Sequence, residues 1–128
     1  MKLLLDTHIW FWLVSDITRL GTRARAEITD AQNELWVSPI STWELVTLNA
    51  KGRIRLSGDP EKWFGRARRG LLEAPVTHDV AKAAAELQMH RDPADRFIAA
   101  TAQVLDLTLV TADEKLLGLG AIQSLANR

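Results

Sequence analysis

Two aspartates in this sequence stand at the ends of apolar runs that are typical of buried strands. Asp6 follows the run at residues 2–5, and Asp113 closes the run at residues 107–113. In open α/β sheets, ligands bind at the carboxyl ends of the strands, where both carboxylates are expected to lie. Either aspartate alone could equally cap the helix that follows it. The pair together indicates a site that uses negative charge.

A third acid, Glu44, lies on or beside the apolar face of a predicted helix. It is bracketed by Trp43 and Leu45, and apolar residues also stand one turn away on either side. A carboxylate held there must be paired, protonated or bound to a cation, because an unpaired buried charge is very costly. A salt bridge to Lys51 or Arg53 would meet that requirement, and so would a metal ion.

The fourth acid, Asp95, belongs to the stretch "DPADRFIAATA" at residues 92–102. Asp92 suits the N-cap of a helix, Pro93 the first helical position, and Asp95 the third, where an acid can reach back to the backbone. The small and apolar residues that follow predict a helix packed into the core. Asp92 is sufficiently explained as a cap, whereas Asp95 can both serve the helix start and bind a ligand.

Four carboxylates in one place would repel each other and raise each other's pKa values, a conflict that a divalent cation resolves. The chain has no cysteine and no regular histidine spacing, so oxygen ligands favour Mg²⁺ or Mn²⁺ over Zn²⁺. Such ions can activate water and stabilise the oxygens of a phosphodiester under attack. We therefore predict hydrolytic cleavage of phosphodiester bonds by an activated water.

The elements that would position these acids alternate along the chain. Short apolar runs predict strands at residues 2–5, 34–38, 71–76 and 107–113. Capping signals and helical spacing predict helices at residues 7–14, 21–31, 39–52, 59–70, 78–88, 93–105 and 114–120. This order predicts a three-layer α/β/α domain with a central, mainly parallel sheet.

Length and composition indicate the number of domains and the kind of surroundings in which the protein works. At 128 residues, the chain is expected to be one domain, residues 1–128, and its formal net charge is zero. The opening apolar stretch is interrupted by Asp6 and His8 and is too short for a membrane span, so we expect a cytoplasmic protein without membrane contact.

Basic residues gather between positions 51 and 69, where seven Lys or Arg face only two acids. A solvated surface is one explanation for this stretch. Contact with a nucleic-acid backbone or an acidic partner is the other, through Arg53, Arg55, Arg66, Arg68 and Arg69.

Taken together, the chain resembles the PIN-domain ribonucleases, and more narrowly the VapC-type toxins of bacterial toxin–antitoxin pairs. The resemblance rests on the order and spacing of "LLLDTHIWFWL", "SPISTWELVTLNAKGRI" and "DPADRFIAATAQVLDLTLVTAD", and covers nearly the whole chain. It implies a PIN-like fold whose catalytic and metal-binding residues fall on Asp6, Glu44, Asp95 and Asp113.

The resemblance also implies an activity and partners. The implied activity is that of an endoribonuclease dependent on Mg²⁺ or Mn²⁺ with RNA as its substrate. The implied partners are a second copy of the chain, since the family is usually dimeric, and a cognate antitoxin whose tail covers the active cleft. Thr7 resembles the hydroxyl residue that often follows the first acid, which implies a supporting role. Asp92 matches a subgroup that reads "DPxDR", but not the family at large, so we expect it to cap the helix and to support the site without binding the metal itself. His8 accompanies the first acid in the same subgroup, and either catalysis or a hydrogen bond within its helix would explain it.

Two alternatives share the fold. One is an RNA-processing PIN nuclease without an antitoxin, and the other is a PIN fold kept as a non-catalytic binding module. A binding module would be expected to lose one or more of the acids, and this chain keeps all four.

The sequence has five tryptophans, which stacking on bases or core packing could explain. Trp10, Trp36 and Trp43 sit in apolar runs and are predicted to lie in the core. Trp12 and Trp63 are predicted to lie at a dimer or antitoxin surface.

Overall fold

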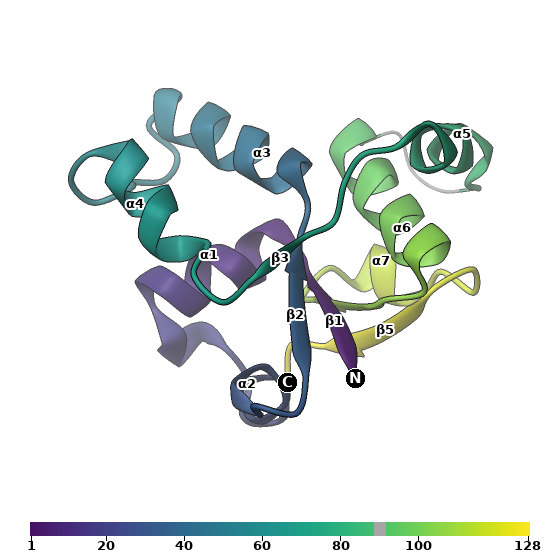
Figure 1. Ribbon diagram of the computed structural model, residues 1–128, viewed down its shortest axis with the longest axis horizontal. Helices are drawn as coiled ribbons and strands as arrows, with labels where there is room; N and C mark the ends of the chain where they lie inside the picture. Colours follow the sequence, from purple (N-terminus) through teal and green to yellow (C-terminus); the bar gives the residue numbers. More distant parts are fainter. Residues whose placement is uncertain (89–91) are drawn as a thin grey trace.

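The computed structural model describes residues 1–88 and 92–128 and contains one five-stranded parallel sheet (Figure 1). The strands, in the spatial order β3-β2-β1-β4-β5, are β1 (Lys2–Leu5), β2 (Glu34–Val37), β3 (Leu72–Glu73), β4 (Thr108–Thr111) and β5 (Gln123–Ala126). All four neighbouring pairs are parallel, with Leu4 of β1 opposite Trp36 of β2 on one side and Leu109 of β4 on the other.

Helices connect the strands and cover both faces of the sheet, which confirms the predicted three-layer α/β/α fold (Figure 1). The helices are α1 (Thr7–Ser15), α2 (Thr22–Thr29), α3 (Pro39–Ala50), α4 (Pro60–Ala67), α5 (His78–Glu86), α6 (Pro93–Leu105) and α7 (Glu114–Leu117), with a 3-10 turn, η1 (Ile17–Arg19). No helix in the described part of the chain has the length and apolar character needed to cross a membrane.

The alternation of side chains along β1 divides the core into two halves. Leu3 and Leu5 point into a cluster with residues of α1, α2 and α4. Leu4 points to the opposite face, into a cluster with residues of α5, α6 and α7. All three leucines are fully buried, so β1 is the centre of the domain.

Helix α3 lies between α1 and α6 and contacts both. Its start follows from local chemistry, because the hydroxyl of Ser38 accepts a hydrogen bond from the backbone N–H of Ile40 and Pro39 takes the first helical position. The strand order reverses between β1 and β4, so the carboxyl ends of these two strands form the switch point of the sheet.

The predicted strands and helices recur in the structure with small shifts at their ends, but one strand escaped prediction. β5 has the sequence "QSLA", of which only Leu125 is buried, so its hydrophobic signal is weak. It pairs with β4 along all four residues and forms an edge of the sheet. The predicted strand at 71–76 shortens to two residues in β3.

Two of the five tryptophan predictions are wrong. Trp63 is only 1% exposed, because α4 folds onto α1 and its ring lies 6.0 Å from that of Trp10. Trp43, predicted to be core, is 61% exposed on α3. Trp10 is fully buried, as predicted, and its indole N–H donates to the carbonyl of Ala67. Trp36 is half-buried against the cluster around Leu4.

Candidate functional site

The predicted acids meet in a hollow at the carboxyl ends of β1 and β4, which we call the acidic hollow. It has a volume of about 430 Å³, and its walls come from α1, α3, the start of α6 and the loop after β4. The lining residues are Asp6, Thr7, His8, Trp12, Glu44, Asp92, Asp95, Ala112 and Asp113. All four predicted catalytic acids and both predicted supporting residues are therefore brought together.

Asp6 stands directly after β1 and is held by hydrogen bonds to both of its carboxylate oxygens. The backbone N–H of Thr7 donates to Oδ1 at 2.9 Å, which makes Asp6 the N-cap of α1. The buried hydroxyl of Thr111 on β4 donates to Oδ2 at 2.6 Å. Burial raises the pKa of Asp6 above its usual range, and the charge of Asp95 adds to the rise, although these hydrogen bonds oppose it.

Glu44 projects from α3 toward Asp6 and is oriented by two hydroxyls. Thr7 Oγ1 donates to Glu44 Oε1 at 2.5 Å, and Ser41 Oγ lies 2.8 Å from Thr7 Oγ1. Because Thr7 has a single hydroxyl proton, Ser41 donates to Thr7 in this chain of bonds. Thr7 and Ser41 are both buried, so these hydrogen bonds fix the Glu44 carboxylate from the interior of the protein.

The surroundings of Glu44 change its acidity. Burial raises its pKa to about 7, the hydrogen bond from Thr7 opposes the rise, and the charges of Asp6, Asp95 and Asp92 add to it. Within the described residues no ion pair joins Glu44 to Lys51 or Arg53, so the salt-bridge explanation for this acid does not hold. The carboxylates of the acidic hollow instead act on each other.

The two aspartates at the start of α6 take different places. Asp92 is exposed and is the N-cap, because its Oδ1 accepts from the N–H of Ala94 at 3.0 Å and from that of Asp95 at 3.5 Å. Asp95 is half-buried at the third helical position. The predicted cap is confirmed for Asp92, and Asp95 is the one whose charge raises the pKa of both Asp6 and Glu44.

Asp113 completes the acidic hollow from the loop after β4. Its Oδ1 accepts from the N–H of Lys115 at 2.9 Å, so it also caps α7. Its own N–H donates to the hydroxyl of Thr111, the residue that holds Asp6. Thr111 thus links the acids that end β1 and follow β4.

The predicted basic residues lie outside this hollow. Arg53 and Arg55 lie between α3 and α4, the other three lie in or just after α4, and all five are exposed. Arg68 forms an exposed ion pair with Glu73 at 3.7 Å. Their contact with RNA or an antitoxin stays a prediction.

The donor set fits a hard divalent cation. Among residues 1–88 and 92–128, no three acidic or histidine side chains form a ready-made cage for a metal. Mg²⁺, however, is usually bound through one or two carboxylates while it keeps several waters. Neighbouring negative charges help to raise the pKa values of Asp6 and Glu44, and a cation bound to these oxygen donors would relieve that repulsion.

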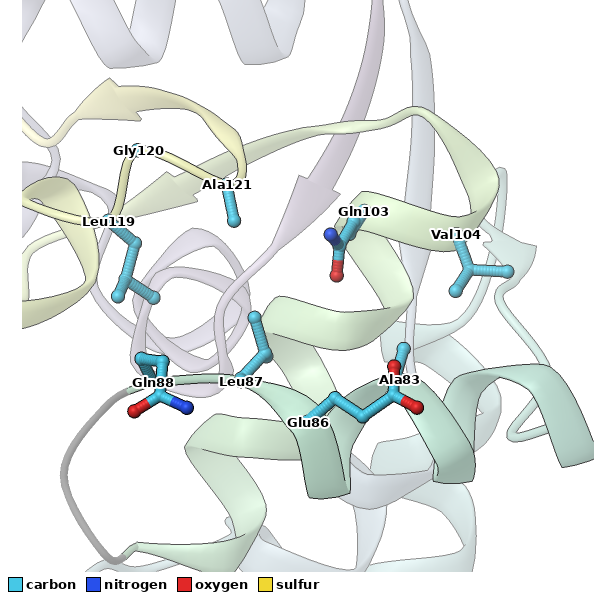
Figure 2. A pocket seen from close by; sticks show the side chains of 9 residues that line it. All are labelled: Ala83, Glu86, Leu87, Gln88, Gln103, Val104, Leu119, Gly120 and Ala121. Atoms are coloured by element: carbon cyan, nitrogen blue, oxygen red, sulfur yellow. The ribbon is translucent and has the colours of Figure 1, made fainter.

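A second, larger hollow lies between α5, α6 and the segment after α7, and we call it the α5–α6 hollow (Figure 2). Its volume is about 630 Å³, and Glu86 is the one ionisable residue among the nine that Figure 2 labels. Most of the other lining side chains are aliphatic, and Gln88 and Gln103 contribute amides. None of the predicted site residues lies there.

Sequence reasoning missed three residues that shape the acidic hollow. Ser41 stands three residues before Glu44, a spacing that places both on one face of α3 and could have indicated it. No local sequence pattern indicated a role for Thr111, because its partner Asp6 is 105 positions away. Trp12 was predicted at a dimer or antitoxin surface, and its half-buried ring lines the acidic hollow, a place that the prediction did not specify.

With this geometry in place, comparison with known proteins identifies the class. Residues 3–121 match the PIN domain family, and the chain belongs to that family. Within it, the chain is 36% identical over 115 residues to ribonuclease VapC22 of Mycobacterium tuberculosis (strain ATCC 25618 / H37Rv). That match covers 88% of each protein.

Solved structures share the fold at lower identity. A chain of VapBC2 from Rickettsia felis, crystallised with a DNA fragment from the promoter, superposes with a TM-score of 0.76 at 17% identity, over 98% of each chain. A chain of DNA-bound VapBC from Salmonella typhimurium gives a TM-score of 0.74 at 17% identity, over 100% of this chain and 99% of that one. At these identities the likeness establishes the fold.

Proposed function

We propose that residues 1–128 form a single PIN domain that acts as the endoribonuclease toxin of a toxin–antitoxin pair and hydrolyses RNA phosphodiester bonds. The observation that carries the proposal is the meeting of Asp6, Glu44, Asp95 and Asp113 at the switch point of a PIN fold. The curated relative at 36% identity is named a ribonuclease, which supports RNA as the substrate.

We infer that these four acids would hold Mg²⁺ or Mn²⁺. When bound, the ion would lower the pKa of a coordinated water and stabilise the oxygens of the phosphodiester. The residues of the chain supply orientation: Thr111 fixes Asp6, and the Ser41–Thr7 pair fixes Glu44. Asp92 contributes by starting α6, which sets the position of Asp95.

The protonation of the acids follows from the same geometry. Without a cation, the raised pKa of about 7 keeps a proton on a large fraction of Glu44 near neutral pH. A divalent ion would favour the charged form and release that proton. Proton release on metal binding is therefore part of the proposed mechanism.

The proposed protein partner is an antitoxin that covers the acidic hollow. Solved structures with this fold include a toxin–antitoxin complex from Klebsiella pneumoniae and VapBC-5 of Mycobacterium tuberculosis, a member of the VapBC family of toxin–antitoxin systems. If a small DNA-binding protein is encoded directly upstream, its co-purification with this chain should abolish RNA cleavage, whereas an unrelated antitoxin should not. Cleavage at an unchanged rate in the presence of the neighbouring protein would favour an RNA-processing nuclease instead.

A homodimer is also proposed, through the outer surface of α3 and the start of α6. Trp43 is 61% and Val46 49% exposed there. A hollow of about 340 Å³ beside Trp43 is lined by Ile40, Pro93, Ala94 and Phe97. Trp43→Glu should convert a dimer to a monomer in sedimentation experiments, and an unchanged mass would exclude this surface.

Cleavage of a labelled single-stranded RNA by the purified chain tests the proposed function. We expect cleavage with Mg²⁺ or Mn²⁺, its loss with a chelator, and its loss in Asp6→Asn with a native circular dichroism spectrum. Asp59→Asn is the matched control, because Asp59 caps α4 outside the acidic hollow. Cleavage by Asp6→Asn at the rate of the unmodified chain would exclude the proposed site.

A further inference from the structure

One wall of the acidic hollow is aromatic and comes from α1. His8 and Trp12 both line the hollow and stand four residues apart, which places them on the same face of the helix. Their ring centroids are 5.7 Å apart, with the planes inclined at 52°. His8 is exposed, whereas Trp12 is half-buried against the cluster around Leu3 and Leu5, so the indole ring has a fixed place in the wall.

A guanidinium group lies over the Trp12 ring of this wall, although Arg19 is not itself one of the lining residues. Arg19, the last residue of η1, holds its Cζ 4.9 Å from the centroid of the Trp12 ring. Arg19 is exposed, and in the part of the chain that the structure describes no ion pair joins it to an acid. Stacking over an aromatic ring limits the motion of a guanidinium while its charge and its N–H donors stay available to an anion.

The negative charge of the acidic hollow explains why a cation such as Arg19 would be needed near it. An RNA strand must bring its phosphates toward five carboxylates: Asp6, Glu44, Asp92, Asp95 and Asp113. A bound metal ion would offset the repulsion at the cleaved phosphate, but the neighbouring phosphates need a cation of their own.

Among the arginines that the structure describes, those of the predicted basic stretch and Arg96 are less suited to that task. None of the five in the predicted basic stretch lines the hollow. The guanidinium of Arg96, near the start of α6, already donates to the carbonyls of Ala84 and Ala85, at 3.1 and 3.2 Å. Arg19 is connected to the hollow directly through Trp12.

We propose that Arg19, held on the face of Trp12, binds a phosphate of the RNA strand next to the bond that is cleaved. This inference rests on the proposed RNA cleavage and adds a substrate-positioning residue to it. The phosphate that Arg19 binds does not react, so its contact is equally strong before and during the chemical step. Loss of Arg19 should therefore raise KM and leave kcat nearly unchanged.

The first test compares Arg19→Gln with Arg25→Gln, an exposed arginine on α2 that serves as the control. We expect Arg19→Gln to raise KM for single-stranded RNA roughly 10-fold, as for a hydrogen bond to a charged group. Its binding, measured in an Asp95→Asn background to prevent cleavage, should lose about 0.7 from the slope of log affinity against log salt. Arg25→Gln should change neither quantity, and Arg19→Lys should restore the salt slope without restoring all of the affinity.

The second test asks whether Trp12 acts through Arg19. Trp12→Leu keeps an apolar side chain against the core but removes the ring, and Trp12→Phe keeps a ring. We expect Trp12→Leu to raise KM, Trp12→Phe to raise it less, and the double variant Trp12→Leu, Arg19→Gln to be no worse than Arg19→Gln alone.

The outcomes separate this inference from the proposed function. If the unmodified chain does not cleave RNA with added metal, the proposed function fails. If it cleaves and Arg19→Gln matches Arg25→Gln in both KM and salt slope, the inference alone fails. Weakened antitoxin binding in Arg19→Gln, with RNA binding intact, would also overturn the inference and assign Arg19 to the protein partner.

Discussion

The α5–α6 hollow is the larger of the two hollows, but the acidic hollow has more ionisable side chains in its wall. The α5–α6 hollow holds about 630 Å³ and has one ionisable residue in its wall. The acidic hollow holds about 430 Å³ and has five carboxylates, two of them with raised pKa values. Folding alone would not favour such repulsion, so the smaller hollow is the one in which we propose that a ligand binds.

The two hollows also differ in the support behind their side chains. Below the carboxylates, the buried hydroxyls of Thr7, Ser41 and Thr111 form hydrogen bonds that fix Asp6 and Glu44. Glu86 is an exposed residue at the end of α5. Substituting matched residues inside and outside the acidic hollow therefore tests how much its acids and their hydroxyl support contribute.

The largest effect is expected from a matched pair of glutamates, one in each hollow. Glu44→Gln should lower RNA cleavage by at least about 100-fold, since it removes a proposed metal ligand, and even residues that only support such ligands cost 10- to 100-fold. Glu86→Gln should leave the rate unchanged. Initial rates on one labelled RNA check both variants, and equal rates would remove the functional distinction between the hollows.

The hydroxyl support should matter less than the acids themselves. Thr7→Val keeps the shape of the side chain but removes the donor to Glu44, and cleavage should fall roughly 10- to 100-fold. Thr101→Val is the control, because Thr101 is also buried but donates to the carbonyl of Phe97 within α6. A similar loss of activity in both variants would mean that general destabilisation, not the bond to Glu44, is responsible.

Stability of the metal-free chain should depend on pH through Glu44. The pKa of this residue rises from 4.5 to about 7 on folding, so the folded chain binds the proton more tightly. The stabilisation is therefore present below pH 4.5 and is lost as pH rises toward 7. Thermal unfolding in chelator should show the unmodified chain losing stability relative to Glu44→Gln across this range.

The effect of added Mg²⁺ on stability is the control for the proposed titration of Glu44. Added Mg²⁺ should stabilise the unmodified chain more at pH 7.5 than at pH 5, because the ion competes with the proton on the acids. If the two chains show parallel pH profiles in chelator, Glu44 does not have the raised pKa on which this account depends.

The smallest effect is expected at the cap of α6. Asp92→Ala removes the acceptor for the N–H groups of Ala94 and Asp95 and should cost about 1 kcal/mol of unfolding free energy, with partial loss of cleavage. Asp92→Asn keeps an acceptor and should retain most of the stability. Urea unfolding of both variants checks this, and an equal loss in both would show that the charge, not the cap, is what matters.

The acids of the acidic hollow could be predicted from the sequence, because the signals that indicate them are local. Asp6 and Asp113 stand where apolar runs end, and Asp92 and Pro93 mark the start of a helix. Parallel strands place their carboxyl ends at one edge, so acids far apart in the chain were expected to meet. The structure brings them to one hollow as expected.

The unpredicted features depend on contacts between distant segments. The bond from Thr111 to Asp6 follows from the pairing of β4 with β1. Trp63 is buried because α4 folds onto Trp10, and Trp43 is exposed because its face of α3 points away from the core. An apolar residue in a helix indicates a buried or a binding surface, and the sequence does not say which.

The central claim is that the acid at the third position of α6 is a metal ligand, while its neighbour at the cap supports the site by starting the helix. Asp95→Asn and Asp92→Asn make the same chemical change three residues apart and both leave the helix start intact. The most direct measurement is the rate of Mg²⁺-dependent RNA cleavage by these two variants. We predict loss of cleavage in Asp95→Asn and retention in Asp92→Asn; the reverse result, at equal stability, would contradict the account.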